Sequence, residues 1–125
     1  MASDTDMVAS CGRDLSALGL DKGPTYSGER LDYKSFWYDM EPFCMLKGLG
    51  PTMRGDNRAD KDSADAKKAA EYERLSLLLW RLLTRAISTT TESGKMLKMQ
   101  VEQEFGNDRD GYELSEYLRA YGNKI

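Results

Sequence analysis

Six acidic side chains lie close together near the carboxyl end of the sequence, and carboxylates are side chains that can take part in catalysis or metal binding. They are Glu102, Glu104, Asp108, Asp110, Glu113 and Glu116, with Arg109 the one base among them. Paired carboxylates can act as general acid and base, or hold Mg²⁺, when they converge in a cleft. These positions fall instead on polar helix faces and in a turn. We therefore expect a solvated surface or a patch that faces a basic partner.

The turn at 107–111 has the alternating oxygen side chains and the glycine of a calcium-binding loop, in which the glycine is the sixth residue. With Gly111 in that place, the first ligand position falls on Gly106 and the twelfth on Tyr117. Neither residue can supply a carboxylate. The sequence therefore predicts a turn and a helix capped by Asp110, and no metal ion.

Histidine is absent, which excludes an imidazole base and the common serine and cysteine triads. The two cysteines, Cys11 and Cys44, are too few for a disulfide framework and lack the paired spacing of a zinc site. We expect them to be free thiols in a reducing compartment. No enzymatic activity and no cofactor are expected.

The chain has 125 residues and a formal net charge of −3, which fits one domain and gives no overall basic field for nucleic acid. We expect an RNA partner only through regions outside this chain. The sequence has no apolar run typical of a secretory signal and none of the ~20 residues that cross a bilayer. These features predict a soluble cytoplasmic protein with no membrane partner.

The amino-terminal part of the sequence is polar and contains several glycines. We expect residues 1–27 to form a flexible arm and residues 28–125 to form a helical domain. Gly23 and Pro24 mark the break that precedes the folded part.

The first helix of the domain is expected to follow Asp32 as its N-cap. Its apolar face recurs at helical spacing and consists of Tyr33, Phe36, Trp37, Met40 and Cys44. Pro42 predicts a kink or a restart, after which Phe43, Met45 and Leu46 form a further apolar turn. The glycines and the proline at 48–51 predict the end of this helix.

Further helices are expected after a charged loop. Residues 54–74 begin as a mobile loop, and their Ala, Lys and Glu content favours helix from about Asp62. This helix continues into a broad leucine stripe, which makes it the central helix of the domain. Ser93 is the expected cap of the next helix, which Gly106 ends, and Asp110 caps the last.

No segment alternates like a strand, so the predicted class is all-α, a compact bundle of four to five helices. One apolar stripe from each helix is expected to meet in a single core. Its predicted members are Tyr33, Phe36, Trp37, Met40, Leu75, Leu79, Leu82, Phe105, Leu114 and Leu118.

Charge is distributed unevenly along the sequence. Residues 75–101 have a net charge of +3, and residues 102–116 have a net charge of −5. Opposite charges on one small domain suit head-to-tail packing between copies. The candidate interface residues are an exposed aromatic, two bases and two acids, namely Tyr38, Arg81, Arg85, Glu113 and Glu116.

The order of these features resembles that of a known family. A tyrosine and a glycine precede a second tyrosine and a tryptophan within residues 26–40, and an apolar and glycine segment follows at 46–50. A charged loop, a leucine-rich helix over 75–87 and a helix ending in Phe105 come next. Over about residues 26–121 this order resembles the opening of the Gag protein of copia-type LTR retrotransposons.

The resemblance implies the amino-terminal part of a capsid domain, a helical unit that self-associates into a shell around the RNA of the element. The sequence differs from the family pattern in Phe36 beside Trp37, in Pro42 and in a longer charged loop. It also lacks the zinc knuckle that many Gag proteins carry further downstream, so nothing in this stretch indicates RNA packaging.

Two other classes of protein fit the same sequence. A small helical adaptor would bind a partner peptide or helix in a groove near Trp37 and Trp80. A small enzyme or metal protein would use the carboxylates between residues 102 and 116. The capsid-type module differs from both because its partner is a second copy of the same chain.

Overall fold

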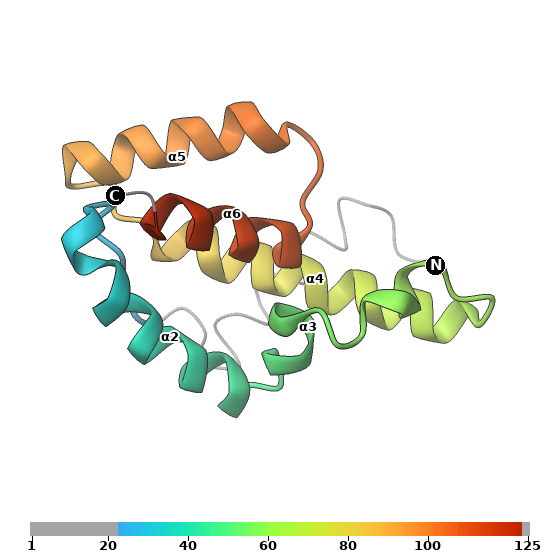
Figure 1. The fold of residues 1–125 in the computed structure, drawn as a ribbon. Helices are drawn as coiled ribbons and strands as arrows, with labels where there is room; N and C mark the ends of the chain where they lie inside the picture. The colour runs from blue at the N-terminus through green and yellow to red at the C-terminus, as the bar shows by residue number, and fades with distance from the viewer. Residues whose placement is uncertain (1–22, 124–125) are drawn as a thin grey trace.

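Helix α4, Ala66–Ala86, is the central element of the computed structural model, which describes residues 23–123 (Figure 1). The Asp65 carboxylate caps it by accepting a hydrogen bond from the Lys67 amide at 3.0 Å. Its leucine stripe is buried, with Leu79 and Leu83 fully enclosed. The predicted central helix is confirmed, but it begins at Ala66 and not near Asp62, because Asp65 supplies the cap.

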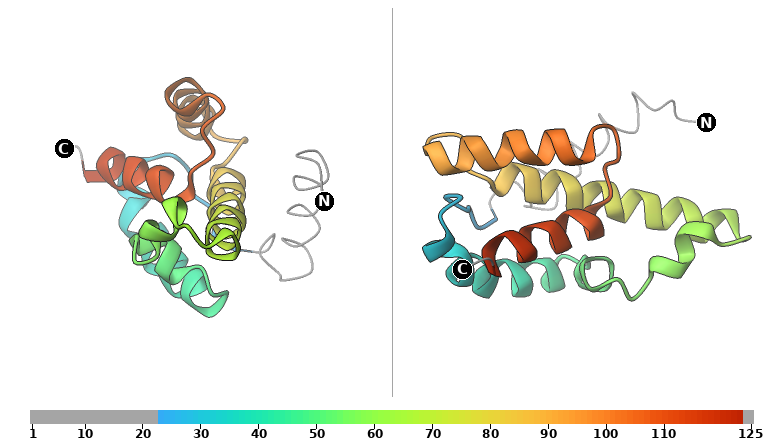
Figure 2. Two further views of the ribbon diagram at one scale, coloured as in Figure 1. Left: turned by 90° about the vertical axis from the view of Figure 1, so that its right-hand side faces the viewer. Right: turned by 45° about the horizontal axis from the view of Figure 1, so that its top comes forward.

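The other described elements surround α4. They are the helices α2 (Tyr33–Leu46), α3 (Gly50–Arg54), α5 (Glu92–Phe105) and α6 (Gly111–Asn123), and the 3-10 turns η2 (Arg30–Asp32) and η3 (Arg58–Asp62). In Figure 1, α5 lies above α4 and α6, while α2 and α3 lie below them, and Figure 2 shows the same arrangement from two other sides. Residues 23–123 contain no β-strand, so the all-α prediction is confirmed.

One cluster of apolar side chains forms the core, and α2, α4, α5 and α6 all contribute to it. Most of the predicted core residues are buried, and Leu75 and Phe105 are partly buried at the edge of the cluster. The cluster also contains apolar residues that helix periodicity did not place there. Tyr26, Leu49 and Ile87 are each 1% exposed; Tyr26 precedes η2, and Leu49 and Ile87 lie in connections between helices.

Helix α2 runs through Pro42 without interruption, so the expected restart is wrong. Proline removes the amide that would donate to the Tyr38 carbonyl, but both residues are exposed, where water can replace that donor. Asp32 holds the N-cap position, as predicted, but its side chain forms no capping hydrogen bond. The Asp32 carboxylate instead accepts a hydrogen bond from the Ser27 hydroxyl at 2.5 Å.

The segment at 48–51 ends α2, as predicted, and also begins α3. Gly48 has a φ of +77°, a left-handed conformation that favours glycine, and it turns the chain. Pro51 lies in the first turn of α3. Backbone amides in the first turn of a helix have no acceptor within the helix, so a proline there removes no hydrogen bond. The charged loop that follows contains η3, and the Arg58 side chain attaches this turn to the bundle.

Thr91, and not the predicted Ser93, caps the amino-terminal end of α5. Its backbone is extended, and its hydroxyl accepts a hydrogen bond from the Gly94 amide at 3.1 Å. The Ser93 hydroxyl donates to the Glu29 carboxylate instead. The end of α5 at Phe105, before Gly106, agrees with the prediction.

A Gly94→Ala variant is expected to lower the free energy of unfolding by about 2 kcal/mol. Alanine usually favours a helix by about 1 kcal/mol over glycine. A Cβ at Gly94, however, would lie 2.2 Å from the Ser88 carbonyl oxygen and 2.7 Å from the Thr91 hydroxyl. Urea unfolding measures the change. The exposed neighbour Lys95→Ala serves as the control, and a stabilised Gly94→Ala variant would contradict the close approach.

The first described residues pack into the body of the domain. The Tyr26 amide donates to the Ala86 carbonyl at 2.7 Å, and the Ser88 amide donates to the Tyr26 carbonyl at 2.8 Å. The Tyr121 hydroxyl donates to the Gly28 carbonyl at 2.6 Å. Residues 1–22 of the predicted arm lie outside the described residues, whereas Tyr26 belongs to the core.

Candidate functional site

An apolar strip runs along the solvent side of η2 and α2, and we call it the α2 strip. It consists of Leu31, Tyr38, Met45 and Leu46, which are 95%, 83%, 57% and 85% exposed. The opposite side of α2 carries the buried residues of the helix, so α2 is apolar on both sides. Large apolar side chains that gather on a surface often mark a contact, so the strip is suited to being covered by another molecule.

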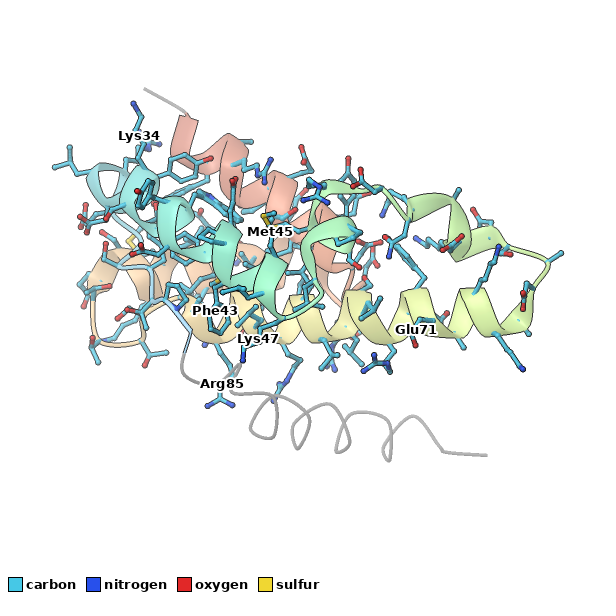
Figure 3. All side chains as sticks on the ribbon, turned by 90° about the horizontal axis from the view of Figure 1, so that it is seen from below. Lys34, Phe43, Met45, Lys47, Glu71 and Arg85 are labelled. Carbon is cyan, nitrogen blue, oxygen red and sulfur yellow. The ribbon has the colours of Figure 1, made fainter. Side chains whose placement is uncertain are left out.

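The spacing within the α2 strip is regular. Leu31, Tyr38 and Met45 are seven residues apart, about two helical turns, which places them in one line. In Figure 3, Lys34 and Met45 lie on the side of α2 away from Phe43, which packs partly buried against the core. Of these residues, Tyr38 alone was predicted to lie at an interface, because the stronger periodicity of the buried face masks the second apolar line in the sequence.

The structure separates the predicted interface bases from the predicted interface acids. Arg81 and Arg85 lie on α4 and line one cavity. Arg85 is exposed and projects from α4 away from α2 (Figure 3). Glu113 and Glu116 lie on α6 and are both exposed. The Glu113 carboxylate already accepts a hydrogen bond from Arg58 at 2.5 Å, which leaves Glu116 as the acid with no ion pair among the described residues.

The acidic run does not converge on one cleft. Asp110 is buried, whereas the other five acids of the run are exposed. Within residues 23–123, no group of three or more acidic or cysteine side chains could hold a metal ion. The structure therefore assigns Asp110 a different environment from that of its neighbours in sequence.

Asp110 belongs to a network of hydrogen bonds centred on Arg58. The Arg58 guanidinium donates to the Asp110 carboxylate at 3.0 Å and to the Tyr72 hydroxyl at 2.9 Å. The Lys61 ammonium lies 3.6 Å from the same carboxylate. These contacts join η3, α4 and the start of α6. The role of Arg58 could not be predicted from the sequence, because its partner Asp110 lies 52 positions away along the chain.

The ionisation of Asp110 follows from these contacts. Burial alone would raise the pKa of its carboxyl group, but two hydrogen-bond donors and two positive charges outweigh that effect and lower the pKa below its ordinary value of 3.8. The donors are the Glu113 amide, which Asp110 caps as predicted, and Arg58. A paired carboxylate with a lowered pKa has a structural role and is a poor general acid.

A cavity of about 260 Å³ lies beside α4, α5 and the turn after α5. We call it the basic cavity, because Arg81, Arg85, Lys98 and Arg109 line it together with one acid, Glu102. Arg81, Arg85 and Lys98 belong to one basic segment of the sequence, so they could be grouped from it. Arg109 could not be added to this group, because its neighbours in sequence are acidic.

The two tryptophans belong to different parts of the core. Trp37 packs edge-on against Phe36 with ring centroids 5.2 Å apart, and the Arg119 guanidinium lies over its ring. Trp80 packs edge-on against Phe105, also with centroids 5.2 Å apart, and lines the basic cavity. An adaptor was expected to use a groove near both tryptophans. Trp37 does not line the basic cavity, so this cavity is not that groove.

Cys44 is a buried free thiol. Burial and the nearby Glu41 charge raise the pKa of this thiol to about 12, so the reactive thiolate is scarce at neutral pH. Cys11 lies outside the described residues. Cys44 thus acts as a small apolar core residue and not as a nucleophile.

Comparison with known proteins returned no family model, no curated protein and no solved structure that matches this chain. Within residues 23–123, no helix is long and apolar enough to span a bilayer.

Proposed function

We propose that this chain is a structural module that associates with copies of itself, as a capsid domain of the copia-type Gag family does. The observation that carries the proposal is the α2 strip, whose four large apolar side chains are 57% to 95% exposed. Covering such a strip with another apolar surface is favourable. The all-helical bundle and the resemblance in sequence agree with this function, which requires no catalytic group.

The α2 strip is complementary to itself in an antiparallel arrangement. A two-fold axis at Tyr38 would place Leu31 opposite the partner's Met45, because both residues lie seven positions from Tyr38. Lys34 lies four positions before Tyr38, and Glu41 lies three positions after it. The same arrangement would therefore bring Lys34 close to the partner's Glu41. Apolar contact and opposite charges therefore favour a second copy of α2 as the occupant.

A shell requires a second contact in addition to a two-fold pair. The predicted charged contact between copies remains the candidate for it. It would join the Arg81 and Arg85 side of α4 to the acidic side of α6, where Glu116 is the acid that lacks an ion pair among the described residues. Both contacts are small, so association is expected to be weak and to depend on concentration.

A Met45→Glu variant is expected to weaken self-association at least about tenfold, because it places a charge opposite Leu31 of the second copy. Sedimentation velocity over a range of concentrations measures the association of the full chain. Met45 is 57% exposed, so the thermal midpoint should change little. Electron microscopy of the concentrated protein is expected to show closed or tubular particles for the unchanged sequence and none for Met45→Glu.

Met99→Glu provides a matched control, because Met99 is 59% exposed on α5 and lies outside the α2 strip. This variant should associate as the unchanged protein does. A protein that stays monomeric at high concentration would contradict the proposal and favour the adaptor. Equal association by Met45→Glu and the unchanged protein would exclude the α2 strip as the contact.

A further inference from the structure

The arginines that line the basic cavity differ from the other arginines of the described residues. Arg54, Arg58, Arg74 and Arg119 each form an ion pair, and the Arg30 guanidinium lies over the Tyr121 ring. Arg81, Arg85 and Arg109 have no ion pair and no ring contact within residues 23–123, and all three line the cavity. The unpaired arginines of the described structure are therefore gathered in one place.

The Arg81 side chain can reach a ligand in the cavity through part of its guanidinium. Its Nε atom is shielded from solvent and has no hydrogen-bond partner within the described residues. A shielded donor without an acceptor destabilises a protein, and a ligand oxygen cannot reach an atom that is closed to water. A ligand in the cavity would therefore contact Arg81 through the terminal nitrogens of its guanidinium, none of which forms an ion pair within residues 23–123.

We propose that the basic cavity binds a small anion that carries two or more phosphate groups. Four bases and one acid give the lining a net charge of +3. A phosphate group brings more charge and more acceptor oxygens than a carboxylate, and arginine forks bind phosphate oxygens in pairs. With about 260 Å³, the cavity is smaller than a typical site for a drug-sized ligand.

The walls of the cavity favour a small anion over a nucleic-acid strand. Proteins that bind single strands provide exposed aromatic rings on which bases stack. Trp80, the one aromatic residue of the lining, is 8% exposed and packs edge-on against Phe105. The cavity therefore supplies positive charge and acceptor contacts but no stacking surface.

Pyrophosphate is the probe for this site, and isothermal titration calorimetry of the full chain at constant ionic strength is the measurement. Pyrophosphate is expected to bind more tightly than inorganic phosphate and to raise the thermal midpoint, because it favours the native state. Arg85→Gln is expected to weaken binding about tenfold. Arg85 is exposed, so this variant should keep its fold, which makes it a safer test than Arg81→Gln.

Two further variants test the site in opposite directions. Glu102→Gln removes the one acid of the lining and should tighten pyrophosphate binding several-fold. Arg54→Gln removes the same charge as Arg85→Gln but lies outside the cavity, beside Asp56, and should leave binding unchanged. Binding by the Met45→Glu variant should also be unchanged, which separates the site from self-association through the α2 strip.

Four results would overturn the proposal. The first is no heat of binding at millimolar pyrophosphate. The second is equal weakening by Arg54→Gln and Arg85→Gln, which would indicate nonspecific attraction. The third is preferential binding of a single-stranded oligonucleotide, which would assign the bases to a nucleic acid. The fourth is loss of self-association in Arg85→Gln without any pyrophosphate binding, which would assign them to a second copy of the chain.

Discussion

A Leu79→Ala variant is expected to lose about 3 kcal/mol of folding free energy. Leu79 is fully buried at the middle of α4, and its side chain lies against Gly111 at the start of α6. Glycine has no side chain that could move into the space that alanine leaves, so most of the cavity should persist. For a domain of this size the loss corresponds to a fall of the thermal midpoint on the order of 10 °C or more.

Leu46→Ala is the matched control for this measurement. It makes the same chemical change at a side chain that is 85% exposed, so the free energy of unfolding should change by less than about 0.5 kcal/mol. Urea unfolding followed by circular dichroism compares the two variants. Equal midpoints for Leu79→Ala and Leu46→Ala would contradict the position of α4 at the centre of the core.

Replacement of Asp110 is expected to have the next largest effect on stability. Asp110→Ala removes both the cap of α6 and the partner of Arg58, at an expected cost of about 3 kcal/mol. Asp110→Asn keeps a capping oxygen and removes the charge, so its cost should be about 2 kcal/mol. Arg58 is partly exposed and keeps Glu113, which limits the loss.

The effect of Asp110 should depend on pH in a definite direction. Its pKa is lower in the folded protein than the ordinary value of 3.8, so the folded state favours the ionised form. The stability that this charge contributes is fully present above the ordinary pKa and is lost as the pH falls through the lowered pKa. The difference between the unchanged protein and Asp110→Asn should therefore be constant near neutral pH and should shrink below about pH 4.

Asp108→Asn is the control for the charge at Asp110. Asp108 lies in the same turn and is exposed, so its replacement should change stability little at any pH. Urea unfolding at several pH values provides the comparison. A difference between the unchanged protein and Asp110→Asn that grows toward acid would contradict the lowered pKa.

The helices of this protein could be predicted from sequence because each presents a regular apolar face. The stripe that includes Leu79 and the cap at Asp110 depend on spacing within a single segment, and both predictions agree with the structure. The short helix α3 was missed because five residues are too few to show a period. The cap of α5 was misplaced by two residues because Thr91 and Ser93 can both accept from a backbone amide.

The surfaces of the molecule were harder to predict, because they combine residues from different segments. Arg109 stands among acids in the sequence but lines the basic cavity. Asp110, its neighbour, turns toward Arg58, so counting charge by segment misassigned both residues. The α2 strip had a local signal, the seven-residue spacing of Leu31, Tyr38 and Met45, which became meaningful only once the opposite side of the helix was known to be buried.

The hydrogen bond between Tyr121 and Gly28 has a consequence for how the protein is made. The segment at 26–29 is translated early, but its partners include Thr91 and Tyr121, which the ribosome adds much later. This segment must therefore remain undocked while the intervening residues are synthesised. The last step of folding can take place only after α6 has left the exit tunnel of the ribosome. If further polypeptide were translated after α6, that polypeptide would occupy the tunnel, and the domain could complete its folding before the chain is released.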